Sequence, residues 1–172
     1  GVGSLANNKA LVIDGVVPMV NSISANTIDG YYKAGDTLVV TVAFSEIVAV
    51  TGVLQLVLET GINNAVIFYT GGSGTTTLNF NYIIELGHNN SDLDYVNTNS
   101  LSLINGLIRD VAGNDANLTL LEPGSSGSLS ANKALIVDAI IPTVSSVSST
   151  TLDSIYNIGD TLVITVNFPE TM

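Results

Sequence analysis

The sequence contains no cysteine and no tryptophan, and only 11% of its 172 residues are charged. Without cysteine the chain has no disulfide framework, no thiol catalysis and no cysteine-ligated zinc. Charged residues usually make up about a quarter of a globular domain. The solvent-facing surface is therefore expected to consist of Thr, Ser, Asn and Gly, as in an exported protein that folds without disulfides.

Basic residues are scarce as well: four Lys and Arg stand against fifteen Asp and Glu, which gives a formal net charge of -11. Nucleic acids and anionic membrane surfaces are bound by Lys and Arg that neutralise phosphate, so neither is expected as a partner. Cations are the small partners that such a chain attracts. No run approaches the ~20 apolar residues of a membrane-spanning helix, so no membrane insertion is expected.

The sequence repeats itself at a constant spacing of 124 residues, the distance from Asp14 to Asp138. Residues 1–48 align with residues 125–172 without a gap, and 24 of the 48 pairs are identical. A period of this length is the size of a whole domain. We therefore predict the last strand of a preceding repeat at 1–14, a complete repeat at 15–138, and the first strands of a following repeat, incomplete alone, at 139–172.

Hydrophobic alternation predicts an all-β fold. In 37–44 and again in 77–84 every second side chain is apolar, a period typical of half-buried antiparallel strands. Strands are predicted at 19–25, 37–44, 53–59, 65–70, 77–84, 101–108, 117–121 and 133–137. About seven short strands in a 124-residue unit indicate an Ig-like Greek-key β-sandwich, with a turn or a short helix in the segment 85–100.

This topology brings acidic residues together at the end of the sandwich where the chain enters. The entry segment carries Asp14, Glu46 follows the second predicted strand, and 109–115 form the loop after the sixth. Ca²⁺ takes six to eight oxygen ligands from carboxylates, amides, carbonyls and water. The predicted calcium ligands are Asp14, Glu46, Asp110, Asn114 and Asp115. The alternative is a tight turn at 112–114 with the acidic side chains in solvent.

A second acidic group, Asp36, Asp92 and Asp94, is predicted at the opposite end. Asp92 and Asp94 have the alternate spacing of calcium loops, but Val96 and Asn97 stand where an EF-hand needs a ligand and a glycine. The favoured interpretation is a solvated loop, with Asp36 capping the turn before the second strand. A second calcium site is the alternative.

No motif indicates catalysis. The single histidine, His88, lies between Gly87 and Asn89 in a polar segment, where an exposed loop residue is expected. A Ser-His-Asp triad would need this histidine, and no nucleophile elbow accompanies it. The segment Gly71–Gly74 lacks the Gly-Lys-Ser/Thr ending of a phosphate-binding loop and is interpreted as a hairpin turn. The sequence therefore predicts that the protein is not an enzyme.

Six segments follow one another in a distinctive order: Lys33–Leu38, Val42–Glu46, Leu56–Gly61, Ser91–Tyr95, Ile108–Asn114 and Gly127–Asp138. Together they resemble the bacterial Ig-like, cadherin-like tandem repeats of giant extracellular surface proteins. The resemblance implies exported adhesins or filament proteins in which calcium stiffens the joints between domains. It assigns this role to Asp14, Glu46, Asp110 and Asn114, and at the next joint to Asp138 and Glu170.

The function implied by this resemblance is a structural module of an adhesin stalk or filament at the cell surface. Its partners would be neighbouring repeats, or identical chains in a fibre. One alternative is a glycan- or receptor-binding domain that displays loops 60–64 and 85–100. Another is a filament subunit whose strand at 1–14 completes the sheet of another chain. The linkers Gly15–Val17 and Ala139–Ile141 are more apolar than in similar repeats, which favours direct packing between domains or contacts within a fibre.

Overall fold

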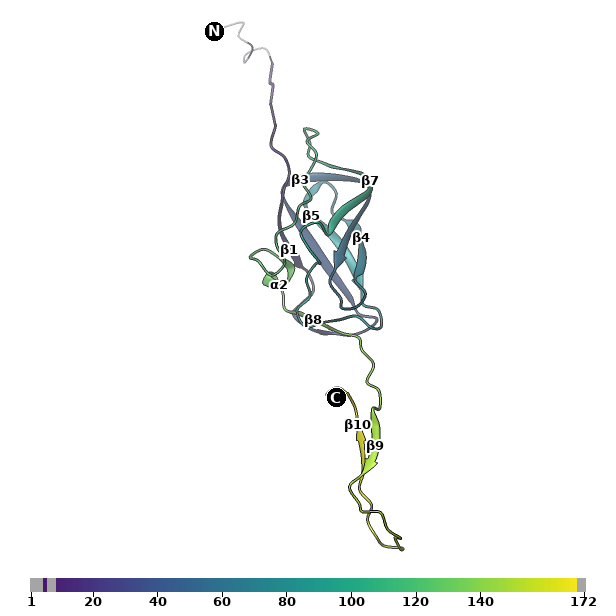
Figure 1. Ribbon diagram of the computed structural model, residues 1–172. Coiled ribbons are helices and arrows are strands. Elements are labelled where there is room, and N and C mark those ends of the chain that lie inside the picture. The colour runs from purple at the N-terminus through teal and green to yellow at the C-terminus, as the bar shows by residue number, and fades with distance from the viewer. Residues whose placement is uncertain (1–4, 6–8, 170–172) are drawn as a thin grey trace. The chain divides into compact units, whose positions relative to one another are not determined.

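The computed structural model describes residue 5 and residues 9–169 (Figure 1). These residues divide into two compact units, one that extends to Ala139 and one that begins at Ile140. Strands dominate the first unit and a β-hairpin lies in the second, so the all-β prediction is confirmed. The helix α2 (Leu129–Asn132) has four residues. No helix in the described part of the chain has the length and apolar character needed to cross a bilayer.

The first unit is built around one long central strand. Its strands are β1 (Val20–Ala25), β2 (Gly30–Tyr32), β3 (Thr37–Leu58), β4 (Ala65–Gly71), β5 (Thr75–Ile83), β6 (Asn89–Asn90), β7 (Leu101–Arg109) and β8 (Leu135–Asp138). The first half of β3 pairs antiparallel with β1 and β5, and its second half with β4 and β7. A small separate sheet has the order β2-β8-β6, with β2 and β8 parallel.

The strands predicted at 37–44 and 53–59 are both present, but as the two ends of one continuous strand, β3, and only the break predicted between them was wrong. The register between β3 and β5 shifts between Ala43 and Val48, and β7 becomes a partner of β3 from Ala49 onward. The chain therefore continues as a strand because each half has its own backbone partners. One consequence is that Glu46 lies within β3 and not in a loop after a strand.

Other predicted elements differ from the observed ones over shorter segments. Residues 117–121 form no strand, and only an isolated parallel bridge joins Asn117 to Met19. The segment 85–100 contains β6 and turns but no helix, whereas α2, which was not predicted, precedes β8. Residues 9–14 form no strand, and residues 1–4 and 6–8 of the strand predicted at 1–14 lie outside the described residues.

The core of the first unit follows the predicted alternation. Leu38 and Val40 of β3, and Leu78 and Phe80 of β5, are fully buried. Burial of a large apolar side chain stabilises the folded state by about 1.5–3 kcal/mol. This shared core fixes β3 against β5, and so fixes the position from which β3 continues to Glu46.

The described residues of the second unit, 140–169, form one hairpin from β9 (Ser146–Ser149) and β10 (Ile164–Asn167). Val166 lies opposite Val147 in this hairpin, as Val42 lies opposite Ile23 between β3 and β1. Each of these residues is related to its counterpart by the 124-residue spacing of the sequence repeat. The repeat in sequence is therefore a repeat in strand register as well.

Candidate metal centre

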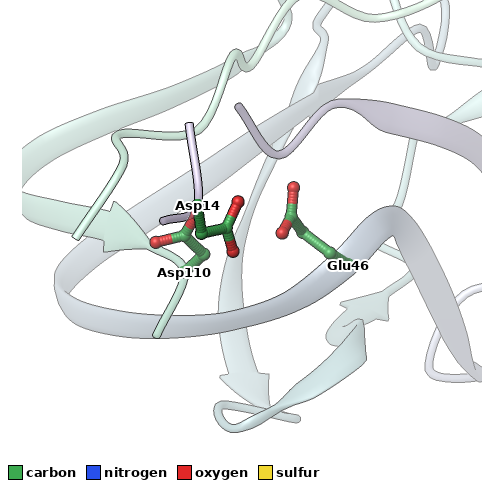
Figure 2. Close-up of side chains that lie close together, drawn as sticks. All are labelled: Asp14, Glu46 and Asp110. Atoms are coloured by element: carbon green, nitrogen blue, oxygen red, sulfur yellow. The ribbon is translucent and has the colours of Figure 1, made fainter. Parts of the chain in front are cut away.

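Three carboxylates from separate segments of the first unit lie close together. Ligand oxygens of Asp14, Glu46 and Asp110 are all within 4.8 Å of one another, and Figure 2 shows the three side chains gathered around one space. Calcium–oxygen distances are about 2.3–2.6 Å, so oxygens on opposite sides of one Ca²⁺ ion are about 5 Å apart. The spacing of the three carboxylates therefore suits one shared cation.

The entry segment reaches the site because it is attached to β3 next to Pro18. Ser45 N–H donates to the carbonyl oxygen of Met19 at 2.8 Å, and Met19 N–H donates to Ser45 Oγ at 3.0 Å. Asp14 precedes this attachment by a few residues, and its Oδ1 accepts a hydrogen bond from Val16 N–H at 3.1 Å. These contacts bring the carboxylate of an exposed segment to the side of β3.

Asp110 follows β7 and organises the loop that contains it. Its Oδ1 accepts from the N–H groups of Gly113 and Asn114 at 2.6 and 2.8 Å, and its Oδ2 accepts from Asn114 Nδ2 at 2.7 Å. Burial opposes ionisation of Asp110, but the hydrogen bonds from Asn114, Gly113 and Ala112 outweigh it and lower the pKa. Asn114 Nδ2 also donates to the carbonyl oxygen of Asp14 at 3.3 Å. Asp110 is therefore an anion held in a fixed position.

Glu46 is the unsatisfied member of the group. Its Oε1 atom is buried and has no hydrogen-bond partner in the described part of the protein. Burial, and then the negative charges of Asp14 and Asp110, raise the pKa of Glu46. A carboxylate in such surroundings is destabilised unless a proton or a cation neutralises it. The arrangement of these three residues can thus hold a metal ion.

The other residues predicted for calcium sites at the joints are placed differently. Asp115 forms an ion pair with Arg109, with Nε and Oδ1 2.5 Å apart. The hydrogen bond from Arg109 lowers the pKa of Asp115, and Asp115 is not part of the three-carboxylate group. Asp138 ends β8, where it lies opposite Asn89 of β6. Glu170 lies outside the described residues.

The second predicted group does not gather into a metal cluster among the residues that the structure describes. Asp36 Oδ2 accepts from Lys33 N–H at 3.0 Å, which confirms that Asp36 caps the turn before the second predicted strand. Asp92 is exposed. Asp94 is buried instead, and its Oδ2 accepts from Gly124 N–H at 2.9 Å and from Ser130 Oγ at 2.7 Å.

His88 is a correction to the sequence analysis, because it is buried and not exposed. Its Nδ1 accepts from Glu85 N–H at 3.2 Å and lies 2.8 Å from the hydroxyl oxygen of Tyr82. A ring nitrogen that accepts from a backbone N–H carries no proton, so the Tyr82 hydroxyl is the donor. Pairing of residue 88 with Ala139 brings the histidine to the core, and no local pattern in the sequence indicates this pairing.

Comparison with protein-family models, curated proteins and solved structures gives no match for this chain. The resemblance to bacterial surface repeats therefore depends on the sequence motifs alone.

Proposed function

We propose that this chain belongs to a non-enzymatic structural protein outside the cell, built from tandem repeats. In this proposal residues 15–138 form one Ig-like Greek-key sandwich of an adhesin stalk or surface filament. Calcium bound by Asp14, Glu46 and Asp110 stiffens the joint at which the chain enters this repeat. The observation that carries the calcium role is the buried Oε1 of Glu46, which has no hydrogen-bond partner among the described residues and belongs to a group of three carboxylates.

A cation at this position would connect three parts of one repeat. Asp14 belongs to the entry segment, Glu46 to β3, and Asp110 to the loop after β7. The cation would offset the repulsion among the carboxylates and attach the entry segment to the body of the repeat. Bending between neighbouring repeats would then be restricted, which is the mechanical property that a stalk or filament requires.

The ligand atoms favour calcium over other common metals. The group offers carboxylate oxygens and neither sulfur nor imidazole, and such hard ligands suit Ca²⁺ and Mg²⁺. Mg²⁺ demands nearly ideal octahedral geometry, whereas Ca²⁺ accepts irregular sites completed by water. Asp14 lies on an exposed segment, where water can supply the remaining ligands. Extracellular calcium modules bind at about 10⁻⁴–10⁻³ M, and this range sets the concentrations for a test.

A calcium titration followed by amide NMR tests the proposal with two matched variants. Glu46→Gln removes one negative charge from the group with little change in shape, and Glu122→Gln removes one from an exposed position. We expect the wild type and Glu122→Gln to saturate in the millimolar range, with shifts in 110–114, and Glu46→Gln to bind at least tenfold more weakly. Equal binding by all three proteins, or no binding by the wild type, would contradict the calcium role.

Glu46 is a better probe of this site than Asp110. Substitution of Asp110 by alanine also removes the acceptor of three hydrogen bonds in the 110–114 loop. That variant would lose stability with or without calcium. Glu46→Gln leaves those hydrogen bonds in place, so a change in its calcium response reports on the metal site.

A further inference from the structure

The strands β4 and β5 of the first unit leave a cavity between them. Tyr69 of β4 lies opposite Phe80 of β5, and toward the start of β4 no further residue pair joins the two strands among the described residues. There β4 pairs with the second half of β3 instead, and β5 pairs with the first half. Residues 65–68 of β4 and 81–83 of β5 line a cavity of about 380 Å³. This volume is within the range of small-ligand pockets, about 300–1,000 Å³.

Several polar side chains around this cavity have no hydrogen-bond partner among the described residues. They are the exposed amides of Asn63, Asn64 and Asn81 and the exposed carboxylate of Glu85. Phe68, which is 49% exposed, adds an apolar surface to the lining. The cavity therefore combines an aromatic ring with a small number of polar groups, which is the usual composition of a specific ligand site.

His88 supplies a buried donor to the same cavity. Its side chain is 7% exposed, and its Nδ1 accepts from Glu85 N–H, so the neutral ring carries its proton on Nε2. Burial, and then the charge of Glu85, raise the pKa of Tyr82, which keeps the Tyr82 hydroxyl protonated as a second donor to Nδ1. Nε2 has no acceptor in the described part of the chain, and it is not among the enclosed atoms that lack a partner. Because His88 lines the cavity, its Nε2–H group is presented there.

We propose that this cavity binds a neutral sugar unit of a glycan. Sugar hydroxyls both donate and accept, as the three amides, the Glu85 carboxylate and the His88 Nε2–H group require. An apolar ligand would leave these groups unpaired. The apolar C–H face of a sugar ring suits the surface of Phe68. Glu85 is the one acidic residue in the described lining, which contains no Lys or Arg, so an anionic ligand would be repelled.

The position of the cavity links it to the glycan-binding alternative and separates it from the metal site. Its polar residues belong to the loops 60–64 and 85–100 and to the adjoining β5, and these two loops are the ones that a glycan-binding domain would display. The cavity shares no residue with the group of Asp14, Glu46 and Asp110. The inference therefore goes beyond the calcium-stiffened joint and does not depend on it.

Amide NMR titrations of the full chain with maltose, lactose and N,N′-diacetylchitobiose test the site. We expect at least one of these neutral disaccharides to bind in the millimolar range, with shifts in 63–68 and 81–88 and at the His88 Nε2–H signal. Asn81→Ala removes one amide from the cavity and should weaken binding about fivefold. Asn99→Ala, at an exposed position outside the cavity, is the matched control and should bind as the wild type does.

The anionic sugar 3′-sialyllactose, compared with lactose, tests the predicted exclusion of negative charge. No binding of any of the three neutral disaccharides, tighter binding of 3′-sialyllactose than of lactose, or equal binding by Asn81→Ala and Asn99→Ala would overturn the proposal. Glu46→Gln should bind sugar as tightly as the wild type, so the calcium site and the sugar site can fail separately.

Discussion

Replacement of Gly52 by alanine should weaken the first unit far more than the same replacement at Gly74, although both glycines have a φ of +81°. Gly52 of β3 lies opposite Gly106 of β7. A Cβ atom on Gly52 would lie 1.7 Å from the carbonyl oxygen of Asn105, whereas nothing lies within 4 Å of a Cβ on Gly74. Both alanines would adopt an unfavourable backbone conformation, but only the first would collide with the neighbouring strand.

The cost of the backbone conformation and the cost of the collision with β7 can be estimated separately. A left-handed backbone costs an L-residue roughly 1–2 kcal/mol, and this is the whole loss expected for Gly74→Ala. Gly52→Ala would also force β3 and β7 apart, and two lost hydrogen bonds at about 1 kcal/mol each bring its expected loss to about 3–4 kcal/mol. For a unit of this size 1 kcal/mol corresponds to about 3 °C.

Thermal unfolding followed by circular dichroism should therefore show a drop of about 9–12 °C for Gly52→Ala and about 3–6 °C for Gly74→Ala. Because β3 carries Glu46 and β7 leads to Asp110, separation of these strands should also weaken the response to calcium. Equal melting temperatures for the two variants would refute the close approach of the two strands.

Three further predictions concern acidic residues. Asp94→Ala removes the buried acceptor of Gly124 and Ser130 and should lower the free energy of unfolding in urea by about 2–4 kcal/mol, with a smaller loss for Asp94→Asn. Because the pKa of Glu46 is raised in the folded state, Glu46→Gln should be more stable than the wild type at neutral pH in chelator. Thermal melts should show this advantage shrink as the pH falls below the folded-state pKa and vanish near the ordinary pKa of a glutamate carboxyl in the unfolded chain, and a gain that persists at about pH 3 would contradict the repulsion. Asp115→Asn breaks an exposed ion pair and should leave the melting temperature and the calcium titration nearly unchanged; a large loss of binding would place Asp115 among the ligands.

Local alternation was sufficient to predict most strands, because burial on one face of a strand leaves a period of two in the sequence. β5 follows this rule, and so does the first half of β3 except at Thr41, which is buried between Val40 and Val42. The continuation of β3 through Ser45 could not be predicted, because a polar interruption in a strand resembles a loop. The segment around Ser45 stays extended because β3 changes its backbone partner there from β5 to β7. Both partner strands are distant from this segment in the sequence.

The candidate site shows the same division between local and distant causes. Asp14, Glu46 and Asp110 could be grouped from the predicted topology, although Glu46 lies within β3 and not after the end of a strand. The direction in which each side chain points could not be predicted. Asp115, for example, forms an ion pair with Arg109 on a neighbouring part of the chain. Burial of His88 likewise results from backbone pairing with Ala139, far along the sequence.

The mobility of the entry segment tests the proposed calcium-stiffened joint most directly. Amide relaxation NMR of residues 11–16 gives their order parameters first in chelator and then in millimolar calcium. We predict that calcium raises them toward ~0.85, the value of rigid backbone, in the wild type but not in Glu46→Gln. Order parameters that are the same with and without calcium in the wild type would contradict the claim that a cation fixes the entry segment to the repeat.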